Sequence, residues 1–101
     1  MSGVFLVFRD PGPSWIRGRS SREQPLWDAH ATFMDRLLAE SRIVLGGPYA
    51  DLSRVLIVVR ARDAEEAATL FRDDPWTESG ILVDSDVVEW TVFLDSGTGA
   101  G

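Results

Sequence analysis

Residues 54–71, RVLIVVRARDAEEAATLF, carry the pattern that decides the fold. The first part is almost continuously apolar and β-branched, which predicts a strand over residues 54–61. Asp63 then stands at a helix N-cap position with Glu66 three residues later, the arrangement of a capping box, and an apolar stripe follows. A helix is therefore predicted over about residues 64–72, directly after the strand.

Outward from this stretch, the same kinds of signal predict one longer helix, three more strands and a short helical turn. Pro25 suits the first turn of the longer helix, whose apolar residues recur at helical spacing. The second strand is expected to break at a Gly-Gly-Pro sequence, and the last strand is expected to bend near residues 84–86. These elements are predicted over residues 24–41 (helix), 3–9, 43–45 and 81–94 (strands) and 74–78 (turn).

The predicted order βαββαβ is that of the ferredoxin-like split motif, an α+β fold. It places both helices on one face of a four-stranded antiparallel sheet. We expect one domain over residues 1–95 and a flexible tail, SGTGAG, over residues 96–101. No internal repeat and no second domain is visible in the sequence.

The strands predicted over residues 3–9 and 54–61 are apolar at both odd and even positions, so both faces of the sheet require burial. Two helices can cover only one face. A second copy of the same sheet would cover the other, which predicts a homodimer through sheet faces. The alternative is a long loop that folds over that face.

Composition excludes several classes of function. Ten basic and sixteen acidic residues give a net charge of −6, which argues against non-specific nucleic-acid binding because that mode needs clustered cations. The sequence has no lysine for Schiff-base chemistry and no cysteine for a disulfide or a thiolate, and a lone histidine leaves a transition-metal site short of ligands. We therefore expect no metal, no cofactor, no membrane span and a cytoplasmic location.

His30 is the single histidine, and helical spacing places it on the apolar stripe of the helix over residues 24–41. A histidine that faces a cavity is the usual proton-transfer residue near neutral pH. The alternative is a core histidine bonded to a backbone carbonyl.

Asp74, which precedes Pro75, has two possible roles. Aspartate before proline is an ordinary helix cap, but a carboxylate can also orient a catalytic histidine. In a βαββαβ fold without additional turns, the two helices run parallel. The start of the first helix and the end of the second then lie at opposite ends of the sheet. A pair with His30 therefore requires residues 74–80 to fold back, or a contribution across the dimer.

Two further groups of residues are candidates for ligand binding. Residues 9–22 contain four arginines and one aspartate, a net charge of +3, which leaves −9 for the rest of the chain. Guanidinium groups suit an anionic ligand, although such a loop can also pair with the acidic body of the protein. Four tryptophans could line a pocket for a flat aromatic substrate, or belong to the core or an interface: Trp15, Trp27, Trp76 and Trp90.

The stretches WDAHATFMDRLLAESRIVLGGP and DAEEAATLFRDDPW, followed by a strand that ends VVEWTVFL, resemble the YciI-like (YCII-related) family. The resemblance covers nearly the whole chain, and its most specific parts are His30, Gly47-Pro48 and Asp74-Pro75 with Trp76. It implies a dimeric α+β barrel of ferredoxin-like subunits, with His30 and Asp74 as the active-site pair. The family includes proteins similar to dehalogenases of chlorinated hydroxyquinols. The long loop with its arginines departs from the shortest members.

These observations lead to one expected function and its alternatives. We expect a cofactor-independent enzyme of the lyase, isomerase or dehalogenase type, acting on a small anionic or phenolic molecule. His30 moves a proton and Asp74 orients it. A binding module that uses the same pocket without chemistry is the alternative, and a structural partner of a larger enzyme is a third possibility. The residues assigned to substrate binding are Arg22, Trp15, Trp76, Gly47 and Pro48.

Overall fold

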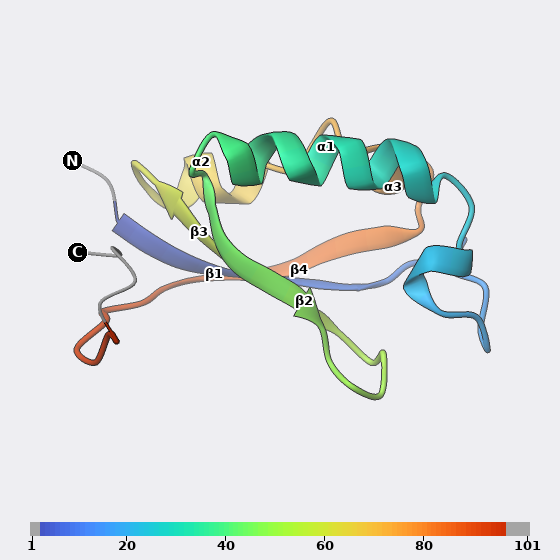
Figure 1. Ribbon diagram of the computed structural model, residues 1–101, viewed down its shortest axis with the longest axis horizontal. Helices are drawn as coiled ribbons and strands as arrows, with labels where there is room; N and C mark the ends of the chain where they lie inside the picture. The colour runs from blue at the N-terminus through green and yellow to red at the C-terminus, as the bar shows by residue number, and fades with distance from the viewer. Residues whose placement is uncertain (1–2, 97–101) are drawn as a thin grey trace.

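Four strands form one antiparallel sheet in the order β2-β3-β1-β4 in the computed structural model, which describes residues 3–96 (Figure 1). This topology confirms the predicted ferredoxin-like α+β fold. The predicted flexible tail, apart from Ser96, lies outside the described residues. In chain order the elements are β1 (Gly3–Pro11), the 3-10 helix η1 (Ser21–Glu23), α1 (Trp27–Ala39), β2 (Ile43–Pro48), β3 (Val55–Ala61), α2 (Ala64–Thr69), α3 (Pro75–Glu78) and β4 (Leu82–Glu89).

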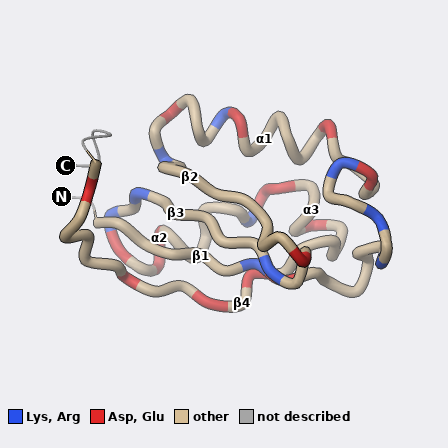
Figure 2. The backbone as a smooth tube through the Cα atoms, turned by 60° about the horizontal axis from the view of Figure 1, so that its bottom comes forward, with Lys and Arg blue, Asp and Glu red and all other residues tan. Residues whose placement is uncertain are grey.

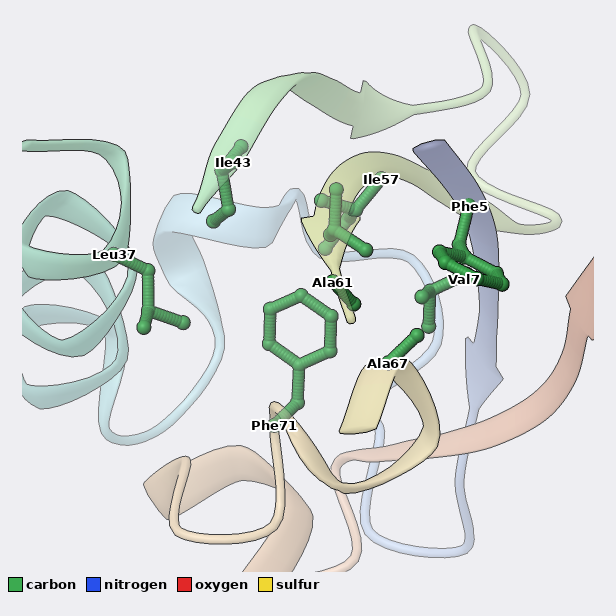
Figure 3. Close-up of a cluster of buried hydrophobic side chains, with 9 residues drawn as sticks. Phe5, Val7, Leu37, Ile43, Ile57, Ala61, Ala67 and Phe71 are labelled. Atoms are coloured by element: carbon green, nitrogen blue, oxygen red, sulfur yellow. The ribbon is translucent and has the colours of Figure 1, made fainter. Parts of the chain in front are cut away.

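The helices lie on one face of the sheet, and the hydrophobic core lies between them and the strands (Figure 1). Alternate residues of β1 point to this face, so that Phe5 pairs with Val59 and Val7 with Ile57. Figure 3 shows the ring of Phe71, which follows α2, directed into the middle of the cluster. The buried core consists of Phe5, Val7, Leu37, Ile43, Ile57, Val59, Ala61, Ala67 and Phe71.

A β-bulge in β4 confirms the predicted bend. Phe8 of β1 pairs with Asp86, but Arg9 pairs with Asp84, so Ser85 is the extra residue. The Ser85 hydroxyl donates a hydrogen bond of 3.2 Å to the carbonyl of Phe8. The bulge shifts the alternation of β4 by one position and turns Asp84 toward the face that the helices cover.

Several element boundaries differ from the predictions. Strand β1 continues to Pro11, two residues beyond its predicted end, and α2 ends at Thr69, before the predicted residue 72. Helix α1 begins at Trp27, two residues after Pro25, because Leu26 adopts a left-handed conformation with φ of 62°. Strand β2 continues through its glycines to Pro48, and Gly46 pairs closely with Ile57, since a Cβ at position 46 would lie 3.1 Å from the Ile57 side chain. Strand β4 ends at Glu89, before the predicted residue 94, although the backbone N–H of Trp90 still donates a hydrogen bond of 2.9 Å to the carbonyl of Val4.

Within residues 3–96, no helix combines the length and the apolar character needed to cross a membrane.

Substitution of Phe71 by alanine tests the position of the core. Phe71 is fully buried, so Phe71→Ala is expected to lower the free energy of unfolding by about 3–5 kcal/mol, measured by urea denaturation. Phe93→Ala removes the same atoms from a side chain that is 89% exposed, and it is expected to cost less than about 1 kcal/mol. Equal losses in the two variants would contradict this placement of the core.

Candidate active site

The side chains of His30 and Asp74 contact each other within one chain. His30 lies in the first turn of α1, and its Nδ1 is 2.9 Å from each carboxylate oxygen of Asp74. Asp74 caps α3, where its Oδ1 accepts a hydrogen bond of 3.0 Å from the backbone N–H of Trp76. The short helix turns the chain back over the sheet after α2, which brings the carboxylate to the start of α1 and makes a contribution across a dimer unnecessary for this contact.

Arg9 joins the pair from β1. Its Nη1 donates to Asp74 Oδ2 at 2.8 Å, its Nε donates to Asp84 Oδ1 at 2.5 Å, and its Nη2 donates to the Thr77 hydroxyl. The guanidinium also lies over the Phe71 ring, 4.9 Å from its centroid. The side chains of Arg9 and Asp74 are both fully buried.

In the sequence, Arg9 groups with the arginines of the loop, and its place in the site was not predicted. The available signal was the alternation along β1. Phe5 and Val7 point to the core, so the next residue on the same face is Arg9. A charged residue that continues an inward-facing series is a candidate for a buried ion pair.

Trp76 fixes the plane of the histidine ring. The two rings are stacked, with centroids 3.8 Å apart and planes 4° from parallel. The indole Nε1 of Trp76 donates a hydrogen bond of 2.7 Å to the carbonyl of Pro25, just before α1. Trp27 lies tilted against both rings, at 5.8 Å from each. The histidine is therefore held by its ring face as well as by Nδ1.

His30 forms part of the wall of a cavity of about 580 Å³, which has α1 on one side and the strands on the other. Both hydrogen bonds of its ring involve Nδ1, and no buried side-chain nitrogen or oxygen among residues 3–96 lacks a partner. Nε2 is therefore accessible, on a side chain that lines the cavity. The lining also includes Arg22, Trp27, Met34, Leu38, Leu45, Gly47, Pro48, Val55, Ile57 and Trp76.

The structure thus brings together most of the predicted site residues, but it places Trp15 elsewhere. Trp15 packs edge-on against Trp76, with centroids 5.9 Å apart, and lines a second hollow with Arg17 and Arg19. Figure 2 shows the basic segments of this loop gathered at one end of the molecule, beyond the start of α1. Of the three arginines at positions 17, 19 and 22, only Arg22 lines the histidine cavity, and its guanidinium lies 5.8 Å from the Trp27 ring centroid.

Asp74 remains ionised despite its burial. Burial alone would raise the pKa of Asp74, but hydrogen bonds from His30, Arg9 and the Trp76 N–H favour the carboxylate and together hold the pKa below its ordinary value of 3.8. The site therefore holds a carboxylate, not a carboxylic acid, against Nδ1. A carboxylate in this position accepts a hydrogen bond from Nδ1–H and leaves the Nε2 lone pair of a neutral ring free for chemistry.

Fold and site define a protein class, that of ferredoxin-like α+β domains, here with a histidine and a carboxylate on a cavity wall. The YCII-related domain family model matches residues 4–91, and the chain belongs to this family. Both findings confirm what the sequence resemblance implied about family and fold.

Two similar proteins give this assignment context. The uncharacterized protein YjpA of Bacillus subtilis (strain 168) is 41% identical over 51 residues, which are 50% of this chain and 60% of that protein. The 5-chloro-2-hydroxyhydroquinone dehydrochlorinase TftG from Burkholderia phenoliruptrix AC1100, solved in complex with 2,5-dihydroxybenzoquinone, has a TM-score of 0.64 at 23% identity. That match covers 87% of this chain and 93% of the other. At this level of identity the likeness establishes the fold.

The lowered pKa of Asp74 predicts a pH-dependent loss of stability in Asp74→Asn. The carboxylate stabilises the folded state above its unfolded pKa of about 3.9, and this contribution disappears as the pH falls through the lower folded value. At neutral pH the variant is expected to lose about 3 kcal/mol or more of unfolding free energy, because Arg9 loses its charged partner. The difference from the wild type should shrink below about pH 4, measured by urea denaturation across pH.

The neighbouring Asp73 is exposed, so Asp73→Asn serves as the matched control and should leave the stability nearly unchanged. A constant difference between Asp74→Asn and the wild type down to about pH 2 would contradict the ionised, bonded state of Asp74.

Proposed function

We propose that the protein is a cofactor-independent enzyme of the lyase, isomerase or dehalogenase type, in which His30 transfers a proton of a substrate bound in the cavity. One observation carries this proposal: the contact of His30 Nδ1 with the buried Asp74 carboxylate, at 2.9 Å, leaves Nε2 free on a side chain that lines the cavity. A base that is oriented by a third group and faces a pocket is the usual arrangement for general acid–base catalysis.

Each partner of His30 has a role in this reaction. Asp74 keeps the Nδ1–H tautomer and stabilises the imidazolium that forms when Nε2 accepts a proton. Trp76 stacks on the ring and prevents it from turning away from the cavity. Because the ring is already held in place, no reorganisation is required when the substrate arrives.

The cavity suits a small, flat molecule with an anionic or phenolic group. Its volume of about 580 Å³ lies in the range of small-molecule sites, and most of its lining is apolar. Trp27 offers aromatic surface, whereas Trp76 is buried behind His30, and Arg22 supplies a cation at the exposed part of the lining. Gly47 and Pro48 complete the lining on the β2 side. The ligand of the TftG structure, 2,5-dihydroxybenzoquinone, supports a search among hydroxylated aromatics and quinones.

The test is turnover of a panel of chlorinated and unchlorinated hydroxyquinols, followed by chromatography and chloride release. Proton transfer by a positioned residue contributes about 10² to 10⁴-fold, so His30→Asn should lower kcat by at least about 10²-fold. Trp90→Phe, at a position 46% exposed and outside the cavity lining, is the control and should retain turnover.

Full activity of His30→Asn would contradict the assignment of His30. A compound that raises the melting temperature of the wild type and is recovered unchanged would favour the alternative, a binding module without chemistry.

We also propose that a second copy of the chain covers the sheet face opposite the helices. Residues of β1 that point away from the core, Leu6 and Phe8, remain half-buried in the single chain. On the same face, Leu45 is 62% exposed and Val88 is 42% exposed. An apolar face of this kind on a soluble protein is typical of an interface, and a twofold contact would pair it with itself. Leu45 also lines the cavity, so the partner would help to close it.

Substitution of Val88 by arginine tests this dimer. A buried, unpaired guanidinium opposes association, so Val88→Arg is expected to give a monomer by light scattering at micromolar concentration, where the wild type is a dimer. Thr32→Arg adds the same charge to an exposed position of α1 and should remain dimeric. A monomeric wild type would overturn the proposal.

A further inference from the structure

Four charged or titratable side chains are connected in one row at the candidate site. Asp84 accepts a hydrogen bond from Arg9 at 2.5 Å, Arg9 donates to Asp74 at 2.8 Å, and Asp74 contacts His30 at 2.9 Å. Arg9 and Asp74 are fully buried, and the Asp84 side chain is 24% exposed. The four residues come from β4, β1, the cap of α3 and α1, so the row crosses the molecule from the sheet to the helix layer.

The net charge of the row explains why it contains all four residues. Asp74 with His30 alone would leave a buried anion without compensation when the ring is neutral. Asp74 with Arg9 alone would be a neutral pair, and Arg9 would then repel a protonated ring. With Asp84 included, the four groups carry −1 when His30 is neutral and zero when it is protonated, so a proton on His30 completes the charge balance.

We infer that Arg9 and Asp84 are positioning residues of the His30 site: Arg9 holds the Asp74 carboxylate in place, and Asp84 offsets the charge of Arg9 so that His30 can accept a proton. Their role in catalysis rests on the proposed function, because it is exerted through His30. The inference extends that function by assigning His30 the role of a base that takes up a proton from the substrate, since proton uptake takes the four groups from −1 to zero.

The bulge at Ser85 supports this assignment. In a regular ladder that continued from the pairing of Phe8 with Asp86, Arg9 would face Ser85, and Asp84 would point to the other side of the sheet. The extra residue puts Asp84 opposite Arg9 instead. Bulges often redirect a side chain next to a functional site, and here the redirected side chain is the second carboxylate of the row.

Few other charges face His30. Arg22 and Asp35 line the same cavity, and both are exposed, so solvent screens them. The residues that β2 and β3 contribute to the lining are uncharged. The response of His30 to pH is therefore expected to depend mainly on Asp74, Arg9 and Asp84.

The test uses the full chain, without a substrate, and measures the reaction of His30 with diethyl pyrocarbonate. Neutral Nε2 attacks a carbonyl carbon of the reagent, an N–C bond forms, and a C–O bond breaks so that ethyl carbonate leaves. The ring then loses its Nδ1 proton to solvent, which gives neutral N-carbethoxyimidazole. The absorbance of N-carbethoxyimidazole reports on this reaction, and His30 is the single histidine. The rate is measured between about pH 5 and 8 in the wild type and in three variants: Asp84→Asn, Arg9→Gln and Asp86→Asn.

The two positioning variants are expected to move the pH profile in opposite directions. Asp84→Asn removes an anion and disfavours the protonated ring, so on the acidic side the reaction should be about threefold faster than in the wild type. Arg9→Gln removes a cation, and the profile should move to higher pH. Asp86→Asn makes the same change of charge at an exposed position of β4 and should leave the profile in place.

A profile of Asp84→Asn that coincides with that of Asp86→Asn would overturn the inference. So would shifts of Asp84→Asn and Arg9→Gln in the same direction, because a general loosening of the site would produce them. If thermal melting shows that Arg9→Gln is unfolded, Asp84→Asn decides alone, since Asp84 is partly exposed. If Asp84→Asn and Arg9→Gln shift the profile in opposite directions but no aromatic substrate is turned over, the role of Arg9 and Asp84 at His30 is confirmed and the proposed enzyme activity is left unsupported.

Discussion

Three segments that are distant in the sequence meet at the buried carboxylate of Asp74. Its oxygens accept hydrogen bonds from His30 of α1, from Arg9 of β1 and from the backbone of α3. A carboxylate without exposed surface is tolerated only with such donors, and each donor would itself be unsatisfied if the carboxylate moved. The relative position of α1, β1 and α3 therefore depends on this one group.

Helix α3 shows how this dependence works. A helix of four residues has no stability of its own, so its position must come from tertiary contacts. Asp74 caps it and binds Arg9, while Trp76 stacks on His30 and donates to the carbonyl of Pro25. The same short segment thus supplies the carboxylate and the ring that hold the histidine. Structural support and orientation of the site are provided by the same contacts.

Local patterns were sufficient for much of this architecture. Asp63 marked the start of α2, and its carboxylate accepts the expected hydrogen bond from the Glu66 N–H, although the Glu66 side chain binds the N–H of Arg62 and does not complete the capping box. The apolar residues at odd and even positions of β1 and β3 indicated a sheet with two apolar faces. The contact of His30 with Asp74 was anticipated as a possibility, although the parallel helices of the bare topology argued against it. The turn after Phe71 is closed by local hydrogen bonds, but its position beside the start of α1, which resolves that difficulty, depends on the long-range contacts of Asp74 with Arg9 and of Trp76 with Pro25.

The rest of the site could not be predicted for a related reason. Arg9 is recognised as inward-facing only when the alternation of β1 is extended one residue beyond its apolar part. Asp84 faces it only because of a bulge, and register between two strands nearly eighty residues apart is a property of the folded sheet. Trp15, by contrast, was predicted to bind substrate. It packs edge-on against Trp76 and lines a different hollow.

Because of the bulge at Ser85, the position of Asp84 in the site depends on the number of residues in β4. Val87 packs against the core and Asp84 faces Arg9, so two side chains three positions apart share one face of the sheet. In a relative without the extra residue, the carboxylate facing β1 would stand two positions before the core valine. An alignment without a gap in this strand would then match Asp84 to a residue on the opposite face of the sheet. The insertion or deletion of one residue would be mistaken for the loss of a charged group.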